Sequence, residues 1–298
     1  MLDKLHRFYN HSLLLSEKPN SSFYSNYHWF KDEKSSKWLG IPFESIQKQE
    51  LALLKTLLHY EFTKNGINTK AKKWYDFLFL DGIIPEADHK SRYQFIQFQL
   101  YGTEWEHSDI EEAIYGFFHD DSIIIWKDQM NGVIIERKPD QRISEKLLLP
   151  LSQTLESDFF IKAFFFCGKV LNLSLQLPKL IEEENKFFEK AIQLIPSERV
   201  YTFEKCFPYL LSAQLPIDMH EWLNSQLLQF ITDEPELLTA VKRFLENNSN
   251  ATLTAKQLYI HRNTLQYRLD KFMQKTGINL KDFNSSITVY LACLLFKE

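Results

Sequence analysis

The sequence predicts an α+β protein in three parts: an N-terminal segment with a hairpin and helices, an α/β middle domain, and an all-α C-terminal domain. Strand-like and helix-like apolar patterns alternate through the middle third of the 298 residues. Prolines then punctuate the chain at Pro196, Pro208 and Pro216, and the apolar patterns after Ile217 have helical spacing. We therefore expect domains at residues 1–90, 91–215 and 216–298.

The composition is that of an ordinary folded protein and limits how it could meet other molecules. Hydrophobic residues make up 44% of the chain, and the net charge of −4 gives no overall attraction to nucleic acid or anionic membranes. Binding to DNA would therefore require a local basic patch. No apolar run resembles a signal sequence or reaches the length of a membrane span. We expect a soluble, cytoplasmic protein without membrane contact.

The three cysteines, Cys167, Cys206 and Cys293, lie far apart and are not accompanied by histidines at metal-binding spacing. This pattern fits neither a disulfide framework nor a zinc site, and it suits a reducing compartment. We expect neither a metal nor another cofactor.

The N-terminal segment predicts a β-hairpin followed by two helices. Residues 27–30 and 37–41 flank a polar stretch and are the expected strands. Apolar residues at three- and four-residue steps predict a long helix over 43–64, capped at Asn65-Gly66, and a second helix over 69–80.

The middle domain reads as strand, helix, hairpin, helix, strand and helix, a pattern of the split βαβ kind. The hairpin turn is expected at Asn131-Gly132, and the last long strand is expected to end at Gly168. The expected strands cover residues 93–100, 122–126, 132–136 and 161–167, and the expected helices cover residues 109–118, 145–156 and 178–194.

Four helices are expected near the C-terminus, and the second and third are joined by only three residues, 259–261. The second helix covers 252–258, with Thr252 or Thr254 as its cap, and the third starts at Arg262 and ends at Gly277. Such a short turn between helices is typical of a helix-turn-helix.

The side chains in this region meet the requirements of that motif. Ala255 is small where the two helices would approach most closely, and Ile260 is an apolar plug for the turn. The inner side of the third helix is apolar, with Leu265, Leu269, Phe272 and Met273 on one side of a helical wheel.

The opposite side carries amide, hydroxyl and basic side chains, which bond base edges and phosphates. The segment from Lys256 to Lys275 contains one acidic residue, Asp270, and several basic residues. We expect Asn263, Thr264, Gln266, Tyr267 and Arg268 to approach base edges. We expect Lys256, Arg262, Lys271 and Lys275 to hold phosphates, and His261 to contact a phosphate or cap the helix.

The string Ile260-His-Arg-Asn-Thr-Leu-x-Tyr-Arg-Leu269 resembles the hallmark of the PucR-type C-terminal helix-turn-helix, which is akin to the module of Fis-like proteins. Thr276-Gly-Ile-Asn-Leu-Lys-Asp-Phe283 fits the same module. The resemblance is close over roughly the last sixty to seventy residues. It implies a bacterial transcriptional regulator that binds double-stranded DNA.

The middle domain is similar, more loosely, to the degenerate GGDEF-like domain that precedes this module in CdaR/PucR-type regulators. Active diguanylate cyclases carry Gly-Gly-Asp/Glu-Glu-Phe on the central hairpin, whereas this hairpin reads Lys127-Asp-Gln-Met-Asn-Gly132. The resemblance therefore implies the fold without enzyme activity.

Several readings stay open. His261 could be a metal ligand, Tyr267 could pack against a neighbouring helix, and Asp120-Asp121 could mark a metal site instead of a solvated turn. The aromatic residues between 23 and 38 could line a ligand pocket, although core packing is the default for such residues.

Because one helix-turn-helix reads few base pairs, we expect a homodimer, joined through the middle domain or the helix at 43–64. A small-molecule effector of unknown kind is an open question. The competing hypothesis is a non-catalytic nucleotide or small-molecule sensor or adaptor whose C-terminal helices serve assembly. As a pure adaptor it would leave the basic outer face unexplained.

Overall fold

The chain forms two compact units, Met1–Ile192 with Pro196–Thr202, and Gln193–Ile195 with Phe203–Glu298. The division falls before Phe203, whereas the sequence placed a boundary near Leu215-Pro216; a finer division into three domains remains a proposal. The computed structural model describes residues 1–17, 27–32, 36–61, 69–85, 92–102, 105, 107–119, 121–137, 143–227 and 233–295.

The first unit begins with a four-stranded sheet in the order β1-β3-β2-β4. The expected hairpin is confirmed, because β2 and β3 pair antiparallel with Trp29 opposite Gly40. Successive residues of a strand point to opposite faces of the sheet. On one face, Trp29 and Trp38 pack with apolar residues of the five-stranded sheet described below, so these two aromatic residues belong to the core. The strands are β1 (Leu13–Leu15), β2 (Tyr27–Lys31), β3 (Trp38–Pro42) and β4 (His59–Glu61).

The other face of this sheet is covered by helices α1 (Leu2–Phe8) and α2 (Lys48–Leu57). The expected helix over 43–64 is wrong in its extent, because α2 ends at Leu57 and β4 follows. Strand β4 pairs antiparallel with β2. This long-range pairing overrides the helical periodicity that continues past Leu57. The expected cap at Asn65-Gly66 lies outside the described residues.

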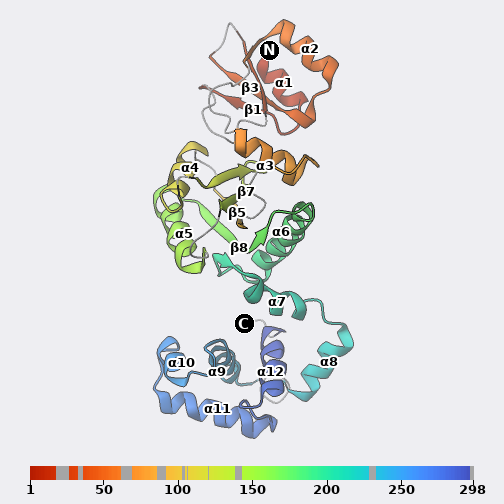
Figure 1. Ribbon diagram of the computed structural model, residues 1–298. Helices are drawn as coiled ribbons and strands as arrows, with labels where there is room; N and C mark the ends of the chain where they lie inside the picture. Colours follow the sequence, from red (N-terminus) through yellow and green to blue (C-terminus); the bar gives the residue numbers. More distant parts are fainter. Residues whose placement is uncertain are drawn as a thin grey trace. The chain divides into compact units, whose positions relative to one another are not determined.

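The second sheet has five strands in the order β6-β7-β5-β8-β9. Strands β8 and β9 are parallel, and the other neighbours are antiparallel. Helices α4 and α5 cover one face and α3 and α6 the other (Figure 1), so the central strand β5 is buried on both sides. The strands are β5 (Arg92–Tyr101), β6 (Ile123–Trp126), β7 (Asn131–Arg137), β8 (Lys162–Asn172) and β9 (Val200–Tyr201). The helices are α3 (Thr69–Phe79), α4 (His107–Tyr115), α5 (Glu145–Phe159) and α6 (Leu177–Leu194). The expected mixed pattern of the middle domain is confirmed.

Two glycines of this sheet have other roles than those expected. Gly132 lies inside β7, where an added Cβ would come within 2.3 Å of the Phe98 ring, so it is required by packing. The turn before it is fixed instead by Asp128, whose Oδ1 accepts hydrogen bonds from the backbone N–H groups of Met130 and Asn131. Gly168 does not end β8. It lies at an irregularity of the β5–β8 pairing, where a Cβ would meet the Phe95 carbonyl oxygen at 2.5 Å.

Every regular element in the described part of the second unit is a helix, as expected. Its core gathers apolar side chains from α9, α10, α11 and α12 and includes Cys293. Cys206 on α7 is buried as well. No described helix of either unit is long and apolar enough to cross a membrane. The helices are α7 (Phe203–Ser212), α8 (Ile217–Gln226), α9 (Pro235–Glu246), α10 (Ala251–Gln257), α11 (Arg262–Thr276) and α12 (Phe283–Leu295).

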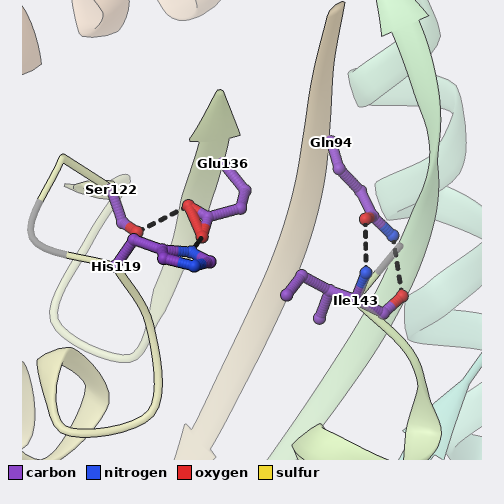
Figure 2. Close-up of polar contacts among 5 residues, drawn as sticks. All are labelled: Gln94, His119, Ser122, Glu136 and Ile143. Carbon is purple, nitrogen blue, oxygen red and sulfur yellow. Dashed lines mark hydrogen bonds and ion pairs between the residues drawn. The ribbon is translucent and has the colours of Figure 1, made fainter. Parts of the chain in front are cut away.

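Buried polar side chains fix the loops of the five-stranded sheet (Figure 2). Gln94 on β5 is fully buried, and its amide exchanges two hydrogen bonds with the backbone of Ile143, at 2.9 and 2.8 Å. Glu136 on β7 is also buried; the Ser122 hydroxyl donates to its Oε2 at 2.6 Å, and Nδ1 of His119 lies 2.7 Å from Oε1. Each group has a partner, which removes the cost of burying it.

Glu184 on α6 is a partly buried acid whose carboxylate lacks part of its hydrogen bonding. Among the described residues its Oε2 has no hydrogen-bond partner, and it lies 3.3 Å from where a Cβ of Gly168 would be. Burial raises the pKa of Glu184 from 4.5 to about 7, although a hydrogen bond from Gln97 and the charge of Lys169 oppose this shift. The folded chain therefore holds this proton more tightly than the unfolded chain.

We expect Glu184→Gln to remove a pH-dependent loss of stability. Because the folded pKa lies above the unfolded one, the contribution of Glu184 is fully present below about pH 4.5 and is lost as the pH rises through about 7. The unfolding midpoint of Glu184→Gln relative to wild type should therefore increase between pH 5 and pH 8. Urea titrations monitored by tryptophan fluorescence measure the two midpoints at each pH.

The matched control is Glu183→Gln, the exposed neighbour on α6, which changes the net charge equally. Its midpoint should keep a constant offset from wild type across this range. A constant offset for Glu184→Gln as well would contradict the raised pKa.

Candidate nucleic-acid interface

Helix α10 begins at Ala251, one residue earlier than expected. Its cap is Asn250, whose Oδ1 accepts a hydrogen bond from the Leu253 N–H at 3.1 Å. The expected cap at Thr252 or Thr254 is wrong. Thr254 is fully buried, and its hydroxyl donates to the Asn250 carbonyl at 2.8 Å. Asn250 takes the cap because its side chain lies just before the first turn, where the free N–H groups are.

The turn between α10 and α11 has the expected small residue and apolar plug, but it is one residue longer than expected because α10 ends at Gln257. Ala255 is 4% exposed, and its carbonyl oxygen accepts a hydrogen bond from the Ile260 N–H at 3.0 Å. Ile260 is half-buried against the core of the unit. The small residue and the apolar plug therefore hold the two helices together across a turn of four residues, 258–261.

The inner face of α11 is confirmed. Leu265, Leu269 and Phe272 are at most 3% exposed, and Met273 is half-buried against the same core. The helix ends at Gly277, which has a left-handed φ of 71° and donates its N–H to the Met273 carbonyl at 2.9 Å.

The residues proposed to bind DNA share the outer surface of α10, the turn and α11. Tyr267 is 63% exposed and therefore open to a partner. Arg268 and Lys271 are half-buried. The exposed members are Lys256, His261, Arg262, Asn263, Thr264, Gln266, Tyr267 and Lys275.

His261 caps α11, as one of its two expected roles required. Its Nδ1 accepts a hydrogen bond from the Asn263 N–H at 3.2 Å. Because Nδ1 is the acceptor, the neutral ring carries its proton on Nε2, which can donate to an anion such as a phosphate. Among the described residues no group of three His, Cys, Asp or Glu side chains could hold a metal ion, and Asp120 lies outside them.

Two of the expected phosphate contacts are engaged within the chain. Lys271 and Lys275 both form ion pairs with Glu234, the residue before α9. Hydrogen bonds from the two lysines lower the pKa of Glu234, and Glu234 in turn raises the pKa of Lys271. Glu234 and Lys271 are therefore both charged at neutral pH. On the same helix, Gln266 donates to Asp270 at 2.9 Å.

Sequence reasoning missed Glu234, and it also missed Asn247. The Asn247 amide donates to the hydroxyl of Thr254 at 3.2 Å and to the side-chain oxygen of Gln257 at 2.8 Å, which ties the end of α9 to α10. The sequence signal for Glu234 is an acid directly before Pro235 at a helix start. Nothing in the local pattern points to its partners on α11.

Comparison with known proteins agrees with this geometry. The family model of the PucR C-terminal helix-turn-helix domain matches residues 237–295, which span α9 to α12 almost completely. The chain is 34% identical to the uncharacterized protein YxkF of Bacillus subtilis (strain 168) over 268 residues, which cover 89% of this chain and 90% of YxkF.

Two named regulators are similar over shorter stretches. The proline-responsive transcriptional activator PutR of Bacillus subtilis (strain 168) is 31% identical over 127 residues, covering 38% of this chain and 31% of PutR. The carbohydrate diacid regulator of Escherichia coli (strain K12) is 29% identical over 112 residues, covering 36% of this chain and 28% of that protein. The chain therefore belongs to the family of YxkF, and with this C-terminal domain it is a member of the PucR-type transcriptional regulators.

Proposed function

We propose that the protein regulates transcription by binding specific sites in double-stranded DNA as a homodimer, with α11 as the recognition helix. The observation that carries this proposal is the division of α11 into two sides. Its inner side is buried, and its outer side presents exposed amide, hydroxyl and basic groups. In a helix-turn-helix, the N-terminal half of the second helix meets base edges while the first helix crosses the phosphate backbone.

The roles follow from this docking geometry. Asn263, Thr264, Gln266, Tyr267 and Arg268 lie in the first half of α11 and approach base edges. The cations outside that group, Lys256 and Arg262, neutralise phosphates, and His261 offers its Nε2 proton. Glu234 holds Lys271 and Lys275, so in wild type these two lysines reach phosphates only in part.

A dimer places two recognition helices on half-sites about 34–36 Å apart. Helix α2 supports this part of the proposal, because Leu53 and Leu57 lie one turn apart on it and each is 58% exposed. Such apolar side chains favour contact with a second copy.

The five-stranded sheet, we propose, is a degenerate GGDEF-like domain that turns over no substrate. The β6–β7 hairpin has the sequence Lys127-Asp-Gln-Met-Asn-Gly132, across its turn and the start of β7, in place of the phosphate- and metal-binding signature. Two similar regulators are named for small molecules, proline and a carbohydrate diacid. This supports a small-molecule effector for this chain too.

A pocket in the first unit is the candidate effector site. It has a volume of about 390 Å³, within the usual range for small-molecule sites. Gln97 is one of its lining residues and donates a hydrogen bond to the Ile181 carbonyl at 3.2 Å. Its lining combines aromatic and apolar side chains of α3 and α6 with polar ones of the β6–β7 hairpin and α6: Tyr75, Phe79, Ile181, Lys127, Asn131 and Asn185.

Arg262→Ala and Arg268→Ala should weaken DNA binding in different ways. Loss of the phosphate contact of Arg262 should lower affinity uniformly across sequences and reduce the salt slope by about one unit. Loss of the base contact of Arg268 should cost about 1–3 kcal/mol on the specific site and relax the preference for it. Fluorescence anisotropy with promoter fragments across a salt series measures both effects.

The control is Arg243→Ala on α9, an arginine of the same unit that pairs with Glu246 at 3.2 Å. Its affinity and salt slope should match wild type. If wild type and the triple variant Arg262→Ala, Thr264→Ala, Arg268→Ala bound promoter DNA equally, α11 would not be the recognition helix.

Glu234→Gln should strengthen binding to DNA of any sequence. The carboxylate no longer holds Lys271 and Lys275, so both can release counterions from phosphates, and the salt slope should steepen by up to about two units. Glu221→Gln on α8 changes the net charge equally and should leave the slope unchanged. An unchanged slope for Glu234→Gln would mean that the two lysines fasten α11 to α9 and do not reach DNA.

Filling the pocket should abolish the response to its effector. We expect a small polar molecule, with proline and a carbohydrate diacid as the first probes, to raise the melting temperature of wild type but not of Asn185→Trp. Asn185→Ala, which leaves the pocket open, is the control. A shift of equal size in the Trp variant would place the ligand elsewhere.

A further inference from the structure

Tyr259 lies in the turn between α10 and α11 with a left-handed backbone, at φ 54°. Its side chain is 96% exposed. For a residue other than glycine this backbone region carries a penalty of roughly five- to thirtyfold in the folding equilibrium. The turns of such motifs often contain glycine, which pays no such penalty. The exposed phenol packs on little in this chain, so its burial does not compensate.

The turn itself requires this backbone. The Tyr259 N–H donates to the Lys256 carbonyl at 3.2 Å, and the next N–H, of Ile260, reaches back to the Ala255 carbonyl at 3.0 Å. These two bonds close α10 and direct Ile260 toward the core. Making both bonds requires a left-handed backbone at Tyr259, and glycine would adopt that backbone at a lower cost in folding free energy. The tyrosine side chain is therefore explained by something outside this fold.

The surroundings of Tyr259 point to a phosphate. Its exposed neighbours in the sequence are Lys256 at the end of α10, His261 in the turn and Arg262 at the start of α11, each able to donate to an anion. In a docked helix-turn-helix this turn lies where the chain passes from the backbone-crossing helix into the groove. Tyrosine hydroxyls are among the groups that donate to phosphate oxygens in protein–DNA complexes.

We propose that Tyr259 is a DNA-positioning residue whose hydroxyl donates a hydrogen bond to a phosphate oxygen at the edge of the major groove. This inference rests on the proposed function of α11. The contact involves a neutral donor, so it releases no counterion and leaves the salt slope unchanged, unlike a contact from lysine or arginine. The hydrogen bond fixes the register of α11 on the DNA. Its loss lowers the affinity for all sequences equally.

The test compares stability and DNA affinity in the full chain. Tyr259→Phe should weaken binding to a promoter fragment by about three- to tenfold with an unchanged salt slope, because a neutral hydrogen bond is lost. Tyr259→Gly should weaken binding at least as much and should raise the melting temperature, because the backbone penalty is relieved. The two readouts of Tyr259→Gly thus move in opposite directions.

Ser249→Gly is the matched control. Ser249 is an exposed residue with φ 60° in the turn between α9 and α10, so the substitution relieves the same kind of penalty. It should raise the melting temperature and leave DNA affinity unchanged.

Two outcomes would overturn the assignment of Tyr259. One is equal affinity of wild type and Tyr259→Phe. The other is a change of salt slope or sequence preference in Tyr259→Phe, which would mean that the side chain acts on charge or on bases. If wild type itself bound none of the promoter fragments, the proposed function would fail first, and the stability readouts would remain as the separate test of the backbone penalty.

Discussion

The inner side of α11 is anchored by Leu265, Leu269 and Phe272, which are almost completely withdrawn from water. Each such side chain contributes about 1.5–3 kcal/mol when fully buried, so together they outweigh most single contacts in the unit. Their partners come from α9, α10 and α12, which explains why these helices occur as one module. Because packing is settled on this side, the outer side can carry polar and basic residues at little cost to folding.

In the first unit, the central strand β5 is buried on both faces and yet carries polar side chains. Gln94 and Gln97 of β5 point to opposite faces, and each is at most 2% exposed. Gln94 bonds to the backbone of Ile143, and Gln97 bonds to the backbone of Ile181. The strand therefore fastens a loop on one face and α6 on the other.

Much of this arrangement could be predicted from the sequence, where the signal is local. The inner face of α11, the small residue at Ala255 and the end at Gly277 follow from helical periodicity and cap chemistry, and the structure confirms them. The long helix at 43–64 failed because β4 pairs with a strand about thirty residues earlier, and no local pattern encodes that pairing.

The other errors share this origin. Gly132 reads as a turn residue, yet the ring of Phe98, distant in sequence, is what requires a glycine there. Lys271 and Lys275 read as free cations because their partner Glu234 is far along the chain. Local chemistry therefore predicted which side chains lie on the outer side of α11, and the fold determined which of them are already engaged within the chain.

The cysteines of the chain have a practical consequence for studying it in solution. All three are buried, and burial raises the pKa of the Cys293 thiol to about 12, so the reactive thiolate is scarce. A cysteine introduced at an exposed position of α11, such as Gln274, would therefore react with a maleimide or nitroxide label ahead of the native thiols. In the proposed dimer, the distance between two such labels would report the separation of the two copies of α11 before any operator sequence is known.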